Sequence, residues 1–394
     1  MTDAPYTPAR RMPWPDPGLT RPVATPLQPS VVYATRDPDA LDAQYAGDAP
    51  GHVYAREGHP NADVLAQMID RMEGAAGGIV TGSGMAAIAA IMLGVLKAGD
   101  HVIGGDQLYG QSVRMLSSEL QRFGIACTLA DPTDVACIER ALRPETRLIL
   151  IEVVSNPTLR VADVEGIAAL ARSRGILLAV DNTFTTPRGF RPFENGADFV
   201  VHSVTKLLAG HADATLGYVV AADPELNASM RAAATTWGLT PSPFDCWLAE
   251  RGLLSFDLRY DRAEDNAARL ADHLASLPGV RRVIYPGRPD HPDHNRAGAL
   301  LNGRFGNMLS FELEGGRREA NRFTQACDIA FAPTLGDIAS TLSHPVSSSH
   351  RRMDPEARNA LGITDGFFRL SVGVEPVDAL IEGISGAVRA ATQA

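Results

Sequence analysis

Residues 176–206, ILLAVDNTFTTPRGFRPFENGADFVVHSVTK, contain two short apolar runs separated by a segment rich in Thr, Pro and Gly. Runs of this length are typical of strands in a parallel sheet that is covered on both faces. Polar residues follow each run directly, with Asp181 after the first run and Ser203 to Lys206 after the second. Ligands of open α/β sheets bind beyond the carboxyl ends of the strands, so we expect the chemistry of this protein in these turns.

The same alternation of strands and helices extends outward from this stretch. Apolar spacings of three and four residues predict helices, and short apolar runs predict the strands between them. We expect helices at 63–72, capped by Asn61, and at 85–96, 111–123 and 164–174, with strands at 77–80, 101–103, 147–154, 176–180 and 198–202. This order predicts a doubly wound α/β domain.

The pattern changes after about residue 250. A long helix rich in Arg and Ala is predicted over 260–277, and strands over 282–285 and 307–313 alternate in a way that indicates a half-exposed antiparallel sheet. We therefore divide the chain into a proline-rich N-terminal arm (1–60), a large domain (61–250) and a smaller C-terminal α+β domain (251–394).

Composition favours small molecules as partners. The formal net charge of −10 and the absence of a Lys/Arg-rich run argue against nucleic acid and membrane surfaces. No apolar run is long enough for a signal peptide or a bilayer span, and four scattered cysteines indicate reduced thiols in a cytoplasmic protein. The histidine clusters at 291–294 and 210–213 lack the spacing of known zinc sites, so no metal is expected.

Only two lysines occur in the chain, Lys97 and Lys206. Lys97 lies at the end of a predicted helix, where an ammonium group meets the helix dipole and stays in water. Lys206 follows a buried strand and lies between hydroxyl residues and a glycine, a place where an amine loses part of its solvation. Such an amine can form a Schiff base with a carbonyl compound, which an arginine cannot do.

Asp181 makes a specific cofactor hypothesis possible. A lone polar residue at a strand end is typical of a turn or cap. Paired with a Schiff-base lysine, its carboxylate can hold a pyridine nitrogen protonated, and this pairing is the binding signature of pyridoxal 5'-phosphate (PLP).

A phosphate site is predicted at the glycine-rich turn TGSGM, which ends at Met85. Free backbone N–H groups of Gly84 and Met85 at the start of a helix favour an anion. Ser203 and Thr205 can add hydroxyl donors, and Arg56 can add charge.

Two further side chains are candidates for the site. Tyr109 follows another predicted strand, where its ring can lie on a flat cofactor and its hydroxyl can transfer a proton. Arg369 lies among apolar residues, where a substrate carboxylate would be a suitable partner; a structural ion pair with Glu375 or another acid is the alternative.

Together these motifs resemble the Cys/Met metabolism family of PLP-dependent enzymes. The family includes cystathionine γ-synthase, cystathionine γ- and β-lyases, methionine γ-lyase and the O-acylhomoserine sulfhydrylases. The resemblance runs from about Pro26 to the C-terminus through Tyr54-Ala-Arg, SGMAAI, LYG, SNPTL, VDNTF, HSVTK, SHP and RLSVGVE, in that order.

The resemblance implies an aspartate-aminotransferase-like (fold type I) architecture and a homotetramer, a dimer of dimers with active sites shared between subunits. It implies that Lys206 is the cofactor lysine and base, that Asp181 binds the pyridine nitrogen and that Tyr109 lies on the ring. The phosphate would be bound by Gly84, Met85, Ser203 and Thr205, together with Tyr54 and Arg56 from the neighbouring subunit. Asn156 would bind the cofactor oxygen, and Asn156, Ser340 and Arg369 would bind the substrate carboxylate.

The pocket departs from the family pattern at several positions. Val53 and Ala339 stand where family members that handle cystathionine often carry acids. Arg114 matches an arginine used near a distal carboxylate, and Gln111 replaces the cysteine of methionine γ-lyases. His59 stands where the family usually shows Asn.

On this basis the leading expectation is a PLP-dependent transsulfuration enzyme, of the cystathionine γ-synthase or cystathionine lyase type, that acts on an amino acid with a distal carboxylate. The alternative is a methionine γ-lyase or an O-acylhomoserine (O-succinylhomoserine) sulfhydrylase. A PLP-binding protein without catalysis is the hypothesis of a different class, and it lacks support because the chain has no attached DNA-binding segment.

Overall fold

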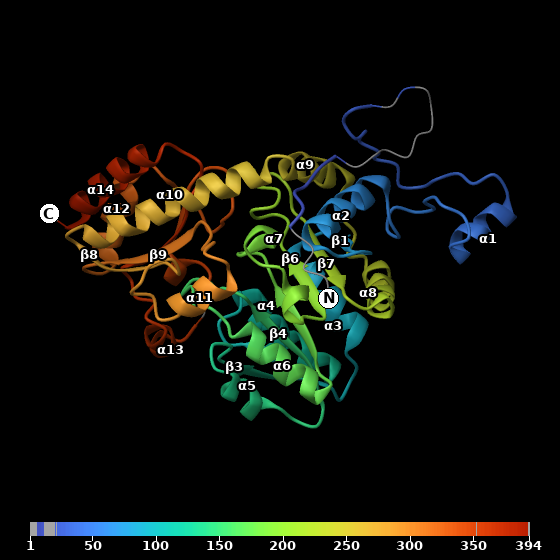
Figure 1. Ribbon diagram of the computed structural model, residues 1–394, viewed down its shortest axis with the longest axis horizontal. Coiled ribbons are helices and arrows are strands. Elements are labelled where there is room, and N and C mark those ends of the chain that lie inside the picture. Colours follow the sequence, from blue (N-terminus) through green and yellow to red (C-terminus); the bar gives the residue numbers. More distant parts are fainter. Residues whose placement is uncertain (1–5, 12–19, 21, 352, 393–394) are drawn as a thin grey trace.

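The computed structural model describes residues 6–11, 20, 22–351 and 353–392 (Figure 1). Parts of the predicted arm, residues 1–5, 12–19 and 21, lie outside the described residues. Within the described part, no helix is long and apolar enough to cross a membrane.

The main sheet has seven strands in the order β1-β7-β6-β5-β4-β2-β3. Strands β2 to β6 run parallel to one another, whereas β7 is antiparallel to both β6 and β1. The strands are β1 (Ile79–Thr81), β2 (His101–Gly105), β3 (Ala126–Ala130), β4 (Thr146–Glu152), β5 (Leu177–Asp181), β6 (Phe199–His202) and β7 (Gly217–Ala221).

Both faces of this sheet are covered, as the apolar runs predicted. In β4, Leu148 and Leu150 pack on the face covered by α3 and α8, and Ile149 and Ile151 pack on the face covered by α5 and α6. The helices around the sheet are α2 (Pro60–Glu73), α3 (Gly84–Val95), α4 (Gly110–Arg114), α5 (Val135–Ala141), α6 (Val164–Arg174), α7 (Thr186–Gly189), α8 (Pro224–Trp237) and α9 (Pro243–Leu253).

Two local predictions in this part are wrong. Asn61 does not cap α2; His59 does, because its Nδ1 accepts the Ala62 N–H at 3.2 Å. Asn61 instead binds the N-terminal segment, through the Gln28 N–H and the Pro26 carbonyl. The helix predicted over 111–123 is irregular, since α4 continues as a π-helix (Met115–Glu119) and a 3-10 helix (Leu120–Phe123).

The second sheet has the order β10-β11-β12-β9-β8, in which β10 and β11 are parallel and the other neighbours are antiparallel. Its elements are α10 (Phe256–Ser276), β8 (Val280–Ile284), α11 (His294–Leu300), β9 (Met308–Leu313), α12 (Arg317–Ala326), β10 (Ala330–Phe331), β11 (Thr341–Ser343), a 3-10 turn (Pro345–Ser347), α13 (Pro355–Ala360), β12 (Phe367–Ser371) and α14 (Val377–Thr392).

The prediction that this sheet is half-exposed is wrong for β9, which is buried at every position. Leu309, Phe311 and Leu313 pack into the core formed with α10, α12 and α14. On the opposite face, the Ser310 hydroxyl donates to the Pro157 carbonyl at 2.7 Å, and Pro157 belongs to the half of the molecule that contains the large sheet. The contact between the two halves covers Met308 and Ser310 on this face, whereas Glu312 is covered by Arg281, Arg282 and Thr364 of its own half.

Helix α10 crosses from one sheet to the other (Figure 1). Near its start, the buried Arg259 donates to the carbonyls of Leu207, Leu208 and Gly252 at 2.9 to 3.1 Å. These bonds attach the helix to the turn that follows β6, which is the segment that carries Lys206.

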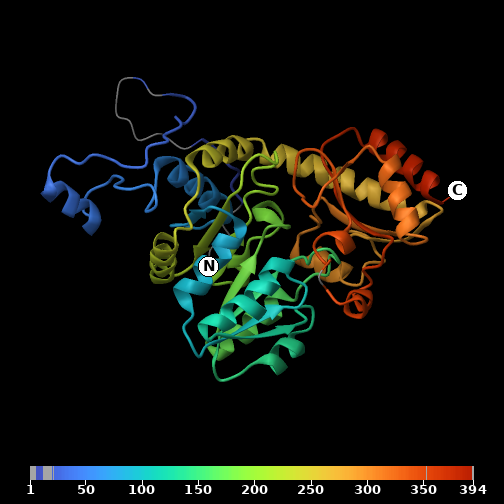
Figure 2. The ribbon, with the colours of Figure 1, turned by 180° about the vertical axis from the view of Figure 1, so that it is seen from behind.

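The N-terminal segment lies apart from both sheets. Helix α1 (Pro38–Ala46) has no buried residue, and the chain around it projects from the main body in both views (Figures 1 and 2). Exposed apolar side chains in this part of the chain are Val23, Leu27, Val31, Val32, Tyr45 and Tyr54.

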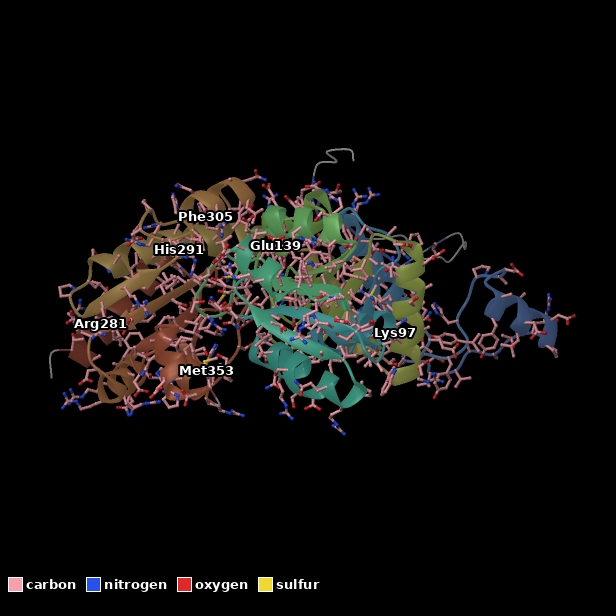
Figure 3. All side chains as sticks on the ribbon, turned by 90° about the horizontal axis from the view of Figure 1, so that it is seen from below. Lys97, Glu139, Arg281, His291, Phe305 and Met353 are labelled. Carbon is pink, nitrogen blue, oxygen red and sulfur yellow. The ribbon has the colours of Figure 1, made fainter. Side chains whose placement is uncertain are left out.

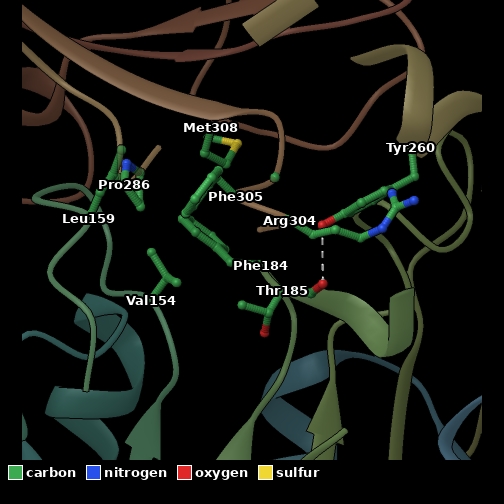
Figure 4. A pocket seen from close by; sticks show the side chains of 10 residues that line it. Val154, Leu159, Phe184, Thr185, Tyr260, Pro286, Arg304, Phe305 and Met308 are labelled. Carbon is green, nitrogen blue, oxygen red and sulfur yellow. Dashed lines mark hydrogen bonds between the residues drawn. The ribbon is translucent and has the colours of Figure 1, made fainter. Parts of the chain in front are cut away.

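A small hollow lies where the two halves meet, lined by Phe184, Tyr260, Phe305 and Met308 among others (Figure 4). Its free space of about 10 Å³ suits one water molecule rather than a substrate. None of the predicted site residues lines it, so the chemistry has to be sought at the strand ends.

Candidate active site

Lys206 lies in a tight turn directly after β6. Its backbone N–H donates to the Ser203 carbonyl at 3.0 Å, and its own carbonyl accepts the Gly210 N–H at 2.8 Å. The amine Nζ lies 3.4 Å from the Thr334 hydroxyl, which comes from the C-terminal part. Partial burial, and secondly the charge of Arg369, lower the pKa of Lys206 from its usual 10.5. A larger fraction of this amine is therefore uncharged than in an exposed lysine at the same pH.

Asp181 ends β5, and its carboxylate is held by the turn that follows. Oδ1 accepts the Thr183 N–H at 3.0 Å and the Thr183 hydroxyl at 2.5 Å. Burial raises the pKa of Asp181, while the two Thr183 bonds and the neighbouring His202 act in the opposite direction. A cationic ring nitrogen is the kind of partner that would favour its ionised form.

Thr183 connects Asp181 to the predicted phosphate turn. Its hydroxyl oxygen accepts the Ser203 N–H at 2.9 Å, and Ser203 packs against Gly84. A Cβ at position 84 would come within 2.8 Å of the Ser203 Cβ, so only glycine allows this approach.

The N-terminus of α3 at this point offers backbone donors. The Ser83 side chain accepts the Ala86 N–H at 3.1 Å, and its carbonyl accepts the Ala87 N–H, which leaves the N–H groups of Gly84 and Met85 for an anion. The Thr205 hydroxyl is already used, because it donates to the Leu216 carbonyl at 3.1 Å and accepts the Leu216 N–H at 2.9 Å.

Arg369, on β12, is only 4% exposed. Its Nη1 donates to Asn156 Oδ1 and its Nη2 to the Thr334 carbonyl, both at 2.7 Å, and Nε has no partner among the described residues. Burial lowers its pKa to about 10. No carboxylate of the described chain pairs with this guanidinium, which is an arrangement suited to an incoming carboxylate.

The alternative partner proposed for Arg369 is wrong. Glu375 instead accepts the Ser340 N–H at 2.6 Å and the Ser340 hydroxyl at 3.0 Å. The Ser340 oxygen also accepts the Gly373 N–H at 2.9 Å, so this side chain holds neighbouring segments of the fold together.

Tyr109 begins α4 and is 42% exposed. Its backbone N–H donates to Glu152 Oε1, at the end of β4, over 2.7 Å. The side chains of Gln111 and Arg114, farther along the same helix, are exposed, and Arg114 forms an ion pair with Glu119 at 3.1 Å.

Tyr54 and Arg56 make no hydrogen bond to the residues around Lys206 within the described chain. Tyr54 is 39% exposed, and the Arg56 guanidinium lies 5.3 Å from its ring centroid. Arg56 donates to the Thr235 carbonyl at 3.3 Å.

Other candidate groups have ordinary partners. In the described residues no group of three or more His, Cys, Asp or Glu could hold a metal ion. His291 Nδ1 accepts the Asp293 N–H at 3.1 Å, and His294 lies 3.0 Å from the Pro286 carbonyl. Lys97 is exposed and lies in the half of the molecule opposite to Arg281 and Met353 (Figure 3).

The sequence reasoning missed three residues that connect the site: Thr183, Thr334 and Glu152. A hydroxyl two residues after a strand-end carboxylate is a recognisable Asx-type turn signal, and an acid that ends an apolar strand marks Glu152. Thr334 has no such signal, because its role depends on a contact between residues 128 positions apart.

These residues fit PLP. The lysine, the strand-end carboxyl, the exposed aromatic residue and the free N–H groups of α3 are the donor set that the aldehyde, ring nitrogen, ring face and phosphate of that cofactor require. The close approach of Ser203 to Gly84 places a hydroxyl beside those N–H groups.

Comparison with known proteins gives the same answer. The family model for Cys/Met metabolism PLP-dependent enzymes matches residues 14–389. The O-succinylhomoserine sulfhydrylase of Pseudomonas aeruginosa is 37% identical, covering 88% of this chain and 86% of that protein. The cystathionine β-lyase of Bacillus subtilis is 40% identical, covering 83% of each.

Among solved structures, the cystathionine γ-synthase of Xanthomonas oryzae in complex with cystathionine superposes with a TM-score of 0.89, at 36% identity and 94% coverage of both chains. The parallel sheet, the lysine turn and these similarities lead to one conclusion. The chain belongs to the Cys/Met metabolism family of PLP-dependent enzymes, whose members are lyases and synthases that act on C–S or C–O bonds.

Proposed function

We propose that this protein is a transsulfuration enzyme of the cystathionine γ-synthase or cystathionine lyase type. The observation that carries the proposal is the link between Lys206 and Arg369 through Thr334. The Thr334 hydroxyl lies beside the lysine amine, and its carbonyl accepts from the guanidinium. Thr334 thus contacts both a basic amine and a guanidinium that can bind a carboxylate. These two groups suit the amino and carboxylate groups of an α-amino acid.

The residues of the chain divide the chemistry between them. PLP, when bound, supplies an electron-poor ring that takes up the electrons left when a Cα–H bond breaks. Lys206 Nζ takes the Cα proton and can return it to a neighbouring carbon, because its lowered pKa keeps part of the amine free. Asp181 keeps the ring nitrogen protonated. The Tyr109 hydroxyl gives a proton to the departing sulfur or oxygen.

The distal end of the substrate is assigned through Arg114. This residue lies one short helix beyond Tyr109, and half of its side chain is exposed, so it can exchange Glu119 for a substrate carboxylate. A surface ion pair of this kind stabilises a protein little, so the exchange costs little. Cystathionine and O-succinylhomoserine both carry a distal carboxylate.

A second candidate is a methionine γ-lyase or an O-succinylhomoserine sulfhydrylase. The residues that favour it are Val53 and Ala339, which offer no counter-charge to the distal ammonium group of cystathionine. The similarity to the sulfhydrylase of Pseudomonas aeruginosa supports it as well.

Product analysis separates these activities. Purified protein with PLP is offered cystathionine, methionine, and O-succinylhomoserine with either cysteine or sulfide. We expect Arg114→Ala to raise KM about tenfold for substrates with a distal carboxylate, since a charge-assisted hydrogen bond is lost, and to leave KM for methionine unchanged.

Arg122→Ala is the matched control, because Arg122 pairs with the same Glu119 at 3.3 Å. Turnover of methionine alone, or equal KM values for Arg114→Ala and the control, would rule out the assignment of Arg114.

We further propose a homotetramer built from two dimers. We also propose that each chain has a large domain over residues 61–250 and a C-terminal domain over residues 251–394. Support comes from Tyr54 and Arg56, whose side chains are exposed and make no hydrogen bond to the residues around Lys206 within the described chain, and from the apolar side chains of the projecting segment. Those residues would complete the site of a neighbouring subunit. A cytoplasmic location stays a prediction.

A further inference from the structure

Two carboxyl groups lie side by side at the base of the site. Glu152 is the last residue of β4 and Asp181 the last of β5, and the two are direct partners in the parallel ladder. Paired residues of neighbouring strands lie about 5 Å apart and point to the same face of a sheet. That face is the one on which Leu150 and Ala179 pack beside α3, so both carboxyls face the cofactor site.

The two carboxyls are unequally supplied with hydrogen-bond donors. Asp181 accepts two bonds, both from Thr183. Glu152 accepts one, from the Tyr109 N–H to Oε1, and its Oε2 is shielded from solvent with no partner among the described residues. Donor bonds stabilise the ionised form of a carboxyl, so Asp181 is the better carboxylate of the pair.

The surrounding charges do not compensate a doubly ionised pair. No arginine or lysine forms an ion pair with either carboxyl in the described part of the chain. The titratable groups around them are His202 at the end of β6, which acts on Asp181, the Tyr109 side chain at the start of α4, and Lys206 and Arg369, whose polar atoms are directed to Thr334 and Asn156.

Two adjacent carboxylates in such surroundings share a proton rather than ionise together. Burial and the neighbouring Asp181 both raise the pKa of Glu152 well above its usual value. A protonated Oε2 is itself a donor, and the carboxylate of Asp181, its partner across the ladder, is the acceptor that sharing the proton provides.

We propose that Glu152 carries the shared proton of the Glu152–Asp181 pair, and that this neutral carboxyl is a positioning residue that fixes the backbone of Tyr109. The pair then presents one negative charge, on Asp181, to the single N–H of the cofactor ring. The inference concerns PLP binding and is independent of which sulfur amino acid is the substrate.

The test compares Glu152→Gln with Glu152→Ala. Glutamine keeps the size, the neutral charge and the carbonyl acceptor for the Tyr109 N–H, whereas alanine removes the acceptor. We expect the PLP dissociation constant of the Gln variant, measured by titrating apo-protein with PLP, to stay within about twofold of the wild type, and that of the Ala variant to rise about tenfold.

Infrared spectroscopy of the apo-protein reads the charge state directly. The difference between wild type and Glu152→Gln near neutral pH should contain the C=O stretch of a protonated carboxylic acid. Carboxylate bands alone in that difference, or PLP binding lost equally in the Gln and Ala variants, would overturn the proposal.

Glu250→Gln is the control for PLP binding. Glu250 is also buried and accepts a single side-chain bond, from Thr25 at 2.7 Å, but it lies on α9 away from the strand ends. Its replacement should leave the PLP dissociation constant unchanged, and thermal unfolding of all variants checks that each is folded.

Discussion

Lys206 and Lys97 are the only lysine amines of the chain, and they lie in opposite surroundings. Lys97 is exposed beyond the end of α3. Lys206 is partly buried beside Thr334, and its amine is influenced by the positive charge of Arg369. Schiff-base chemistry needs an uncharged amine, and burial together with the charge of Arg369 lowers the pKa of Lys206.

At the residue scale, borohydride reduction of the protein with PLP should therefore label one lysine. Mass spectrometry should find the label at Lys206 and none at Lys97, because Lys97 lies outside the group of residues that fits PLP. Lys206→Ala should abolish the label and the absorption of the bound cofactor near about 420 nm, while Lys97→Ala keeps both. A label on Lys97 in the wild-type protein would contradict the assignment.

At the scale of an element, the start of α2 depends on a histidine. His59 Nδ1 accepts the Ala62 N–H, and Nε2 lies 3.2 Å from the Pro241 carbonyl, to which it donates. The ring is therefore neutral in the folded protein, and burial lowers its pKa below 6.5. A histidine can cap this helix as an asparagine would, because both side chains can accept the same N–H.

The cap should make the protein sensitive to acid. Since the folded pKa of His59 is lowered, its stabilising contribution is complete above about pH 6.5 and decreases as the pH falls toward the folded value. His59→Asn keeps the cap without the titration, so its thermal unfolding temperature should fall less than that of the wild type between pH 8 and pH 5.

His59→Ala provides the comparison, because it should lower the free energy of unfolding by about 1 kcal/mol above about pH 6.5 and by less at pH 5, where the wild type loses the same contribution. Equal pH dependence in the wild type and the Asn variant would show that His59 does not titrate in this way.

The helices and strands could be predicted from local sequence patterns, without reference to the residues of the site. The continuous apolar run from Leu148 to Ile151 predicted a strand buried on both faces, and β4 is such a strand. The cap at Asn61 was misread because the position of Pro60 at the first helical residue is the stronger signal. The burial of β9 was missed because it comes from the contact of Ser310 with Pro157, which no local pattern contains.

The site was predictable where a residue type is chemically constrained. Lys206, Asp181 and Arg369 could be proposed from the sequence because an amine, a strand-end carboxyl and a buried guanidinium each need a partner, and their roles stay predictions. Thr334 and the shared proton of Glu152 were not predictable, since they depend on distances between residues far apart in the chain.

At the scale of the whole molecule, the proposed sharing of sites between subunits predicts complementation. Lys206→Ala and Arg56→Ala chains should each have little activity alone. Unfolded together and refolded as a mixture, they should recover about a quarter of wild-type activity, because half of the dimers are mixed and each has one intact site.

Separately refolded chains, mixed without exchange of subunits, are the control and should stay inactive. Failure of the co-refolded mixture to regain activity, with normal assembly, would place Arg56 in its own chain's site.

The position of Thr334 has a consequence for which molecules the enzyme can accept. One residue contacts both the lysine amine, through its hydroxyl, and the Arg369 guanidinium, through its carbonyl. The spacing between base and carboxylate-binding group is therefore set by a single threonine rather than by two independent loops. A β-amino acid, whose carboxylate lies one carbon farther from the carbon that bears the amino group, does not match this spacing. With Lys206 and Arg369 in their proposed roles, selection for α-amino acids is built into the backbone of the site, and changes in the distal pocket can alter the leaving group without relaxing it.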